Sequence, residues 1–485
     1  MPEAVRPGVA IQESGGPPPI TGVSTIVAAM LGPAERGPVA PCRVRRADDY
    51  ARVFGGPVAG TWLAQAVQDC FANGGRHLVV CRVVGAGATV ASVTLGGLII
   101  RASGPGAWGN QVAVRIAHDP DGRVDMTTAY WPDAVPPGDP FGEGQPPAQI
   151  LEEWPGRLAT TDGEPAAPDL ALIGVEWTPD GRGVAPPAGV HRLAGGADGN
   201  APGLDDYRGL PTQERAEPQG LAALDASTFD DVAVVHAPAA PTEVAAAVVA
   251  DCARRRDRFA VVDGTAAIVA DARRAVGDSA FGACYWPWVT VSDGVGGARS
   301  HRPPGGAVVG IYGRVDIERS VFTAPASEGI AGALDVAEPI TAVESSALLQ
   351  RGVNPIQRFP GRGVRVWGAR TLSSDPEWRY VNVRRYAIYL EQSMARGTAW
   401  AVFEPGTPET WTRVRSSVEQ FLTLEWRNGG LCGNRPEQAF FVRCDASTMT
   451  ADDIAAGRLV CTVGLAMLRP AEFIVLRVGH QGQPA

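Results

Sequence analysis

The sequence predicts a multidomain protein of α/β and α+β class: an α/β domain split by a β-rich insertion, followed by a C-terminal α+β domain. Three observations lead to this prediction. The chain has 485 residues, more than one hydrophobic core usually holds. Apolar runs alternate with helical periodicity on both sides of a Pro- and Gly-rich stretch. Two long helical patterns then lie in the last third of the chain.

Changes in these patterns set the predicted domain boundaries. The domains are an extended arm at 1–20, an α/β domain in two segments at 21–87 and 200–351, a β-rich insertion at 88–199 and a C-terminal α+β domain at 352–485.

The predicted arm contains a short extended run. Val9 and Ile11 alternate with Ala10 and Gln12 before the Gly/Pro-rich stretch 15–19 interrupts the pattern. A strand this short is not stable alone, so we expect it to pair with a sheet elsewhere. The alternative interpretation is a frayed terminus.

Short strands and helices alternate in the two α/β segments. The first segment predicts strands at 25–31 and 77–84 and helices at 48–54 and 61–73. Because these strands are apolar without alternation, we expect a parallel sheet covered on both faces. The second segment continues the pattern, with strands at 232–236, 259–262 and 284–291 and helices at 241–256, 265–276, 306–314 and 342–351.

The insertion between these segments predicts strands at 98–102, 112–117 and 124–128, the last two joined by the turn at 119–122. Long Pro- and Gly-rich connections follow. We therefore expect a β-rich domain with long surface loops.

The C-terminal domain opens with a strand pattern around 363–367, in which Val364 and Val366 face one way and Arg365 and Trp367 the other. Two helices are predicted after it. The first helix should start at 374–377, with an apolar stripe at Val383, Tyr386, Leu390 and Met394. The second should start at Thr407-Pro408-Glu409, with an apolar stripe at Trp411, Val414, Val418, Phe421 and Leu422. Strands are predicted at 399–403, 440–444 and 459–467.

The last apolar run predicts a strand that is apolar on both faces. An apolar edge strand left free would aggregate, so we expect another subunit to cover it. Its residues are Phe473, Ile474, Val475, Leu476 and Val478.

Composition excludes several classes of protein. The net charge of −9, with all 43 basic residues arginine, argues against a nucleic-acid binder. The sequence has no run of 18 apolar residues and its N-terminus lacks a secretory pattern, so neither a membrane span nor secretion is expected. The eight cysteines form no C-x-x-C pattern and mostly lie in apolar runs, which predicts buried free thiols and a cytoplasmic protein.

Motifs for catalysis are missing from the sequence. A phosphate-binding Walker loop requires a lysine, and the chain has none. The glycines at 104, 106 and 109 match a dinucleotide-binding pattern but precede a predicted strand, where that motif needs a helix. The six histidines are scattered, and no metalloprotease or serine-hydrolase motif occurs. We therefore expect no catalytic, cofactor or metal site, and we expect that the protein is not an enzyme.

One long segment resembles a known family. The run Phe359-Pro-Gly-Arg-Gly-Val-Arg-Val-Trp-Gly-Ala-Arg-Thr-Leu372, followed by Val381-Asn-Val-Arg-Arg385, is similar to the C-terminal domain of contractile tail sheath proteins of phage tails and phage-tail-like injection systems. Shorter matches, such as Trp108-Gly109-Asn110 and Phe403-Glu404-Pro405, extend the resemblance over most of the chain, except for 120–200.

The resemblance implies a structural subunit that polymerises as stacked hexameric rings around an inner tube and contracts to drive the tube through a target envelope. It implies no cofactor. The implied partners are other copies, the inner tube protein, and baseplate and cap proteins, without nucleic acid or direct membrane insertion. The protein would be cytoplasmic on synthesis and then part of a phage tail or injection particle. The arm, through Val9, Ala10, Ile11 and Gln12, and the last strand, at 473–478, would be exchanged between subunits to complete the C-terminal domain.

The resemblance also implies that the C-terminal domain faces the tube. Arg384, Arg385, Arg413 and Arg415 are then candidates for contacts with acidic tube residues. The alternative is that these arginines form internal salt bridges. Two other functions stay open from the residues: a non-contractile capsid or scaffold protein, and an α/β enzyme built on the second α/β segment.

Overall fold

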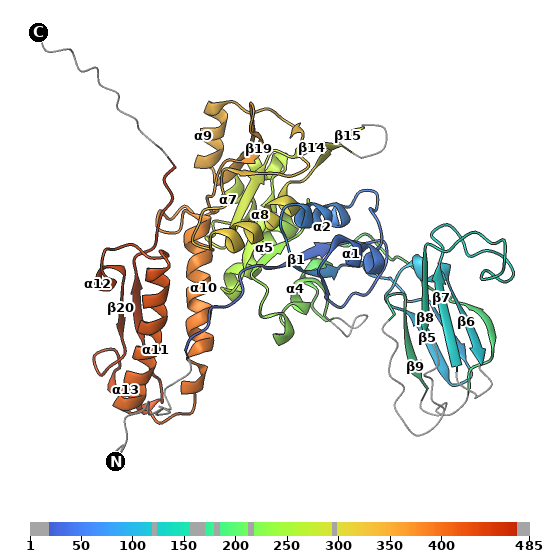
Figure 1. Ribbon diagram of the computed structural model, residues 1–485, viewed down its shortest axis with the longest axis horizontal. Coiled ribbons are helices and arrows are strands. Elements are labelled where there is room, and N and C mark those ends of the chain that lie inside the picture. The colour runs from blue at the N-terminus through green and yellow to red at the C-terminus, as the bar shows by residue number, and fades with distance from the viewer. Residues whose placement is uncertain are drawn as a thin grey trace, which may run out of the picture. The chain divides into compact units, whose positions relative to one another are not determined.

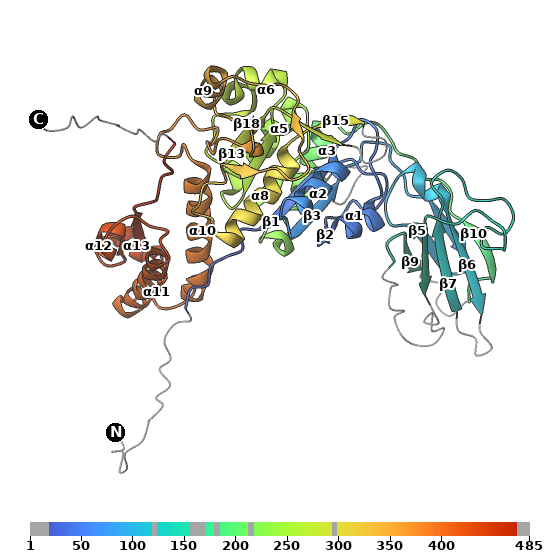
Figure 2. The same ribbon diagram turned by 45° about the horizontal axis from the view of Figure 1, so that its top comes forward.

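The computed structural model describes residues 19–118, 124–154, 170–178, 185–211, 218–292 and 298–472. These residues form two compact units (Figures 1 and 2). The larger unit comprises 24–385, and the smaller combines 19–23 with 386–472. The predicted domain ranges differ from these bounds and stay predictions.

A nine-stranded mixed sheet is the centre of the larger unit. Its six inner strands are parallel, and antiparallel strands pair at its two edges. The apolar runs predicted five of these parallel strands, but no strand was predicted at Val353–Phe359. The strand order is β16 (Glu328–Gly329), β19 (Gly363–Val366), β18 (Val353–Phe359), β13 (Gly282–Trp286), β12 (Phe259–Asp263), β11 (Val234–His236), β1 (Val27–Gly32), β3 (His77–Arg82) and β2 (Cys42–Val44).

Helices pack on this sheet and on each other. Two of them, α2 (Leu63–Ala72) and α8 (Gly305–Glu318), lie close together because α8 has glycine at the contact. A Cβ atom added at Gly310 would lie 2.2 Å from the carbonyl oxygen of Cys70. The other elements are α1 (Ala47–Phe54), α3 (Leu204–Arg208), α4 (Gly220–Ala223), η2 (Ser227–Phe229), α5 (Thr242–Arg255), α6 (Ala266–Ala270), α7 (Ala272–Val276) and α9 (Ala342–Gln350).

The insertion is β-rich, as predicted, and its strands enclose a separate core around Trp108. Its predicted turn at 119–122 lies outside the described residues. One antiparallel sheet has the order β10 (Gly189–Arg192), β6 (Val112–His118), β7 (Val124–Tyr130), β8 (Ile150–Trp154), and the other has β4 (Ser92–Leu95), β5 (Leu98–Ala102), β9 (Ile173–Trp177), with η1 (Ala107–Gln111) between β5 and β6.

Two predicted elements of the larger unit are divided in the structure. The strand predicted at 284–291 separates into β13 and β14 (Val289–Ser292), because Pro287 has no N–H to continue a ladder. β14 instead pairs with β15 (Arg299–Arg302) and β17 (Asp335–Val336). The helix predicted at 265–276 breaks at Asp271, whose side chain caps α7 by accepting from the Arg274 N–H.

The first C-terminal helix starts later than predicted, at Val381. The carboxylate of Asp375 accepts a hydrogen bond from the Glu377 N–H at 2.8 Å and closes a local turn instead of a helical one. The Val381 N–H then donates to the carbonyl of Ala369. The resulting helix, α10 (Val381–Gly397), begins in the larger unit and continues in the smaller one from Tyr386.

The smaller unit is α+β. The prediction of a strand at 399–403 is wrong. Consecutive turns follow α10 directly and form η3 (Ala399–Ala401), and Phe403 is fully exposed. The long helix with its Thr407 cap and apolar stripe is confirmed. The elements after η3 are α11 (Pro408–Arg427), α12 (Pro436–Ala439), β20 (Phe440–Arg443), α13 (Ala451–Ala455) and β21 (Thr462–Leu465).

Candidate assembly interface

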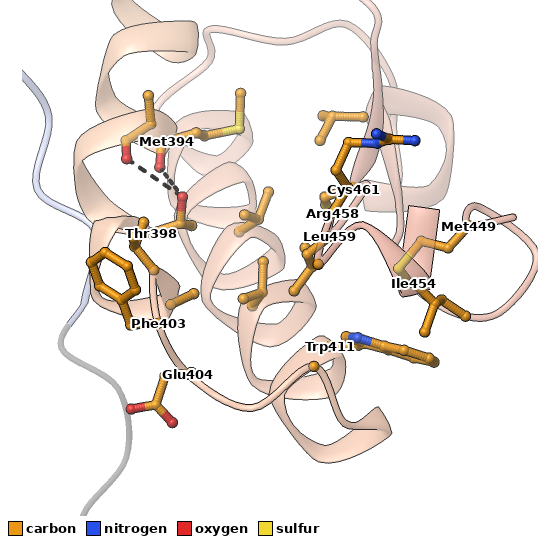
Figure 3. A pocket seen from close by; sticks show the side chains of 18 residues that line it. Met394, Thr398, Phe403, Glu404, Trp411, Met449, Ile454, Arg458, Leu459 and Cys461 are labelled. Atoms are coloured by element: carbon orange, nitrogen blue, oxygen red, sulfur yellow. Dashed lines mark hydrogen bonds between the residues drawn. The ribbon is translucent and has the colours of Figure 1, made fainter. Parts of the chain in front are cut away.

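The smaller unit contains an apolar groove of about 750 Å³ (Figure 3). Side chains of α11, including Trp411, Val414 and Val418, line one part of it. Cys461 and Val463, on the segment that carries β21, line another. Val414 and Val418 are themselves buried, whereas Trp411 is partly exposed at the groove.

Exposed apolar side chains accompany this groove. Val402 and Phe403 line it, yet they are 63% and 102% exposed, and Ile454 is 48% exposed. Large apolar patches of this kind on a soluble protein commonly mark a binding surface. The groove and these side chains together form a candidate interface for an apolar partner segment.

A short sheet lies beside the groove. β20 and β21 pair antiparallel, with Phe440 opposite Leu465 and Arg443 opposite Thr462. Among residues 19–472 that the structure describes, no third strand joins this ladder. A two-stranded ribbon is marginally stable in water, and its unpaired backbone groups can accept an added strand. The strand residues predicted for exchange, Val9–Gln12 and 473–478, lie outside the described residues.

The chain just after the predicted arm is fixed along α10. Ile20 is buried, and a Cβ atom on Gly397 would lie 2.6 Å from its side chain. The Val23 N–H donates to Ser393 Oγ at 3.0 Å. Gly22 passes so close to Tyr389 that a Cβ there would lie 2.2 Å from the ring hydroxyl. No local sequence pattern indicates this anchor, because its contacts join residues about 370 positions apart.

Arg385 lies in the interior of the larger unit. Its guanidinium donates to both carboxylate oxygens of Asp316, at 2.9 and 2.7 Å, and to the carbonyl of Thr25. Both side chains of this ion pair are at most 3% exposed. Burial alone would lower the pKa of Arg385, but the charge and hydrogen bonds of Asp316 raise it overall.

Arg384 is also buried, with its guanidinium 4.5 Å from the ring centres of both Phe281 and Trp378. The ion pair of Arg385 favours the alternative of an internal salt bridge for that residue, and the ring contacts of Arg384 give it an internal role of another kind.

The two arginines on α11 are partly exposed, unlike Arg384 and Arg385. Arg413 is 37% exposed, packs on the ring of Trp400 at 4.5 Å and has Glu404 at 3.4 Å. Arg415, also 37% exposed, lies 3.8 Å from Glu419. Both guanidinium groups can reach solvent, so they stay candidates for contacts with a partner.

A buried carboxyl joins α10 to α11. Glu425, on α11, accepts hydrogen bonds from the hydroxyls of Tyr386 at 2.9 Å and Tyr389 at 3.1 Å. Burial raises the pKa of Glu425 above its ordinary value of 4.5, and the two tyrosine hydroxyls oppose that rise only partly. The helix pair that carries the groove therefore contains a carboxyl that resists ionisation.

This carboxyl predicts a pH-dependent stability. Because the pKa of Glu425 is raised by folding, its contribution is fully present below pH 4.5 and is lost as the pH rises through the folded value. Glu425→Gln cannot ionise and keeps an amide oxygen as acceptor. We expect the melting temperature of this variant, relative to that of the wild type, to increase as the pH rises above 4.5. Thermal denaturation of both proteins across that pH range measures the difference. Glu419→Gln, at a half-exposed carboxyl of the same helix, is the control. A constant difference between Glu425→Gln and wild type would contradict the assignment.

An α/β enzyme would bind its ligand at the carboxyl ends of parallel strands such as β11 and β12. Asp263 lies there, buried, but its carboxylate accepts from the N–H groups of Gly305 at 2.7 Å and Ala239 at 2.8 Å. It therefore caps the start of α8. Within the described part of the chain, no cluster of three or more His, Cys, Asp or Glu residues could hold a metal ion, and no helix is long and apolar enough to cross a membrane.

Comparisons with protein families find two matches that adjoin. A model of the phage tail sheath protein central domain matches residues 213–372, and a model of the phage tail sheath C-terminal domain matches residues 373–480. Together they span more than half of the chain.

Curated relatives match over shorter stretches. A putative prophage major tail sheath protein of Pseudomonas aeruginosa is 26% identical over 191 residues, which are 38% of this chain and 48% of that protein. The tail sheath protein of Enterobacteria phage T4 is 24% identical over 35% of this chain and 25% of its own length. The matched part is thus about half of the first relative and a quarter of the second.

Solved structures match over the whole chain. The contracted helical sheath of the anti-feeding prophage has a TM-score of 0.63 at 24% identity, covering 99% of this chain and 100% of that one. The contracted sheath of the PVC extracellular contractile injection system has a TM-score of 0.61 at 23% identity, covering 99% of both chains. A chain of the anti-feeding prophage baseplate has a TM-score of 0.59 at 24% identity, covering 99% and 100%. At these identities the likeness concerns the fold.

Proposed function

The chain belongs to the phage tail sheath family, a family of structural proteins, and on that premise we propose that it is the repeating subunit of a contractile sheath. Copies of it would stack as hexameric rings around an inner tube, and their contraction would drive the tube through a target envelope. The main structural observation behind this proposal is the apolar groove, because its exposed side chains are suited to contact with a partner segment. The fold that the chain shares with two contracted sheaths also supports the proposal.

We further propose that neighbouring copies supply the missing strands. The arm residues Val9–Gln12 of one copy and the run 473–478 of another would add to the edges of β20 and β21. Their apolar side chains would enter the groove, and their backbone groups would extend the ladder. Main-chain pairing of this kind lets copies stay connected while whole units rotate as rigid bodies.

Contacts with the inner tube are proposed for Arg413 and Arg415. Both are half-exposed and paired at 3.4 Å or more with carboxylates that are themselves exposed. Exposed ion pairs contribute about 0–1 kcal/mol each, weak enough to be broken when a sheath contracts. Baseplate and cap proteins would bind the ends of the sheath, a proposal supported by the fold shared with a chain of the anti-feeding prophage baseplate.

Negative-stain microscopy of the full-length protein, expressed alone and with its inner tube protein, tests the function. We expect rods or short cogwheel-like tubes, and wider, shorter tubes after contraction. Particles that never exceed a single subunit would contradict the proposal, and a lattice with only one state would indicate a non-contractile scaffold. In the same experiment Arg413→Glu should still form tubes but recruit less inner tube, whereas unchanged recruitment would remove Arg413 from the tube contact.

A further inference from the structure

Two cysteines of the smaller unit lie opposite each other where β20 and β21 end. The ladder pairs Val442 with Val463 and Arg443 with Thr462. Continued by one residue beyond the two strands, this register places Cys444 opposite Cys461. All eight cysteines are free thiols, and these are the two that the register brings together.

The hydrogen-bond pattern fixes the type of this pair. The Ala466 N–H donates to the Ala439 carbonyl at 2.8 Å, which makes that pair a hydrogen-bonded one. Pairs along an antiparallel ladder alternate in type, so Cys444 and Cys461 form a non-hydrogen-bonded pair. The Cα atoms of such pairs are about 4.5 Å apart, within the range that a disulfide spans.

The surroundings hold the two thiols together. The Thr448 hydroxyl accepts from the Asp445 N–H at 3.3 Å and donates to the Val460 carbonyl at 2.8 Å, which ties the residue after one cysteine to the residue before the other. Each thiol is within hydrogen-bonding reach of the other. Cys444 is 2% exposed, whereas Cys461 is partly exposed and lines the groove.

We propose that Cys444 and Cys461 form a redox-active pair that closes to a disulfide in an oxidising medium. With glutathione disulfide as the oxidant, the thiolate of the more accessible Cys461 attacks one sulfur and releases one glutathione thiolate. Cys444 then loses its proton and attacks the Cys461 sulfur, which releases the second glutathione. Two cysteine thiols are oxidised while one glutathione disulfide is reduced to two glutathiones.

The two thiols have different roles for physical reasons. Burial first, and then the charge and hydrogen bond shared with Cys461, raise the pKa of Cys444 to about 12. Burial also raises the pKa of Cys461, but accepting that bond opposes the rise. Closing the pair would link the two strands beside the groove and fix the intervening loop, which includes α13. The inference does not depend on the proposed sheath function.

Mass spectrometry of non-reduced peptides from the full-length chain, incubated with glutathione disulfide, tests this. The wild type should yield a cross-linked Cys444–Cys461 peptide, and so should Cys432→Ser, which changes another partly exposed thiol of the same unit. In Cys444→Ser the cross-link should be lost and a glutathione adduct should remain on Cys461. In Cys461→Ser the buried Cys444 should stay unmodified. A wild type that keeps both thiols free, or carries glutathione on Cys461 without cross-linking, would overturn the proposal.

Discussion

Deleting residues 1–14 is expected to abolish ordered tubes while the chain still folds. The truncation stops before the anchor on α10, so Ile20 and the hydrogen bond from Val23 to Ser393 are kept. What it removes is the proposed exchanged strand. Each backbone hydrogen bond contributes about 0.5–1.5 kcal/mol net, so losing two to four of them costs roughly 3 kcal/mol per subunit contact. A loss of that size raises the protein concentration needed for assembly about a hundredfold.

Sedimentation and negative-stain microscopy measure this loss, with circular dichroism as the check on folding. A matched pair of point variants gives a finer control. Val9→Ser with Ile11→Ser changes the apolar face of the predicted strand, whereas Ala10→Ser with Gln12→Ser changes the opposite face. Only the first pair should weaken assembly. Ordered tubes formed by the truncated chain at the wild-type concentration would rule out exchange through the arm.

Local pattern was sufficient where packing repeats with a fixed period. The alternation of Val364 and Val366 with Arg365 predicted which side chains of β19 are buried. The 3.6-residue spacing of Val414 and Val418 likewise predicted the buried side of α11. The parallel sheet followed from apolar runs that do not alternate, because both of its faces are covered.

Local pattern failed where a competing local bond or a distant neighbour decides the structure. A helix was predicted to start at 374–377, but the Asp375 side chain closes a local turn there instead. The sequence permits both structures and does not show which of them is more stable. The run 399–403 has the composition of a strand, yet none of the described residues pairs with it, and it forms turns. The groove and the Ile20 anchor depend on contacts between segments far apart in the sequence, so periodicity alone could not reveal them.

The first turn of α10 shows the same limit. Arg384 and Arg385 lie off the apolar stripe of Val383 and Tyr386, which suggested exposure on a helix with one buried side. In the structure the side chains from Val381 to Ile388 are all buried, so the arginines needed partners inside the protein. Asp316 and the aromatic rings supply them.

Arg385→Met is expected to destabilise the larger unit by about 3–5 kcal/mol, because it leaves the carboxylate of Asp316 buried without its cation. The midpoint of urea denaturation measures the effect. Arg413→Met is the matched control, since its ion pair with Glu404 is more than a third exposed on both sides, and it should cost less than about 1 kcal/mol.

A double variant shows whether the lost stability comes from the unpaired carboxylate of Asp316 or from the lost packing of Arg385. Arg385→Met with Asp316→Leu removes both charges, so most of the lost stability should return if the buried carboxylate is the cause. If the double variant stays as unstable as Arg385→Met, the loss arises instead from the packing of Arg385 on the Tyr312 ring at 4.6 Å and its bond to Thr25. If Arg385→Met costs no more than Arg413→Met, the internal role of Arg385 is wrong and contact with a partner becomes the better explanation. The size of one denaturation shift thus decides whether this arginine stabilises the subunit or the assembly.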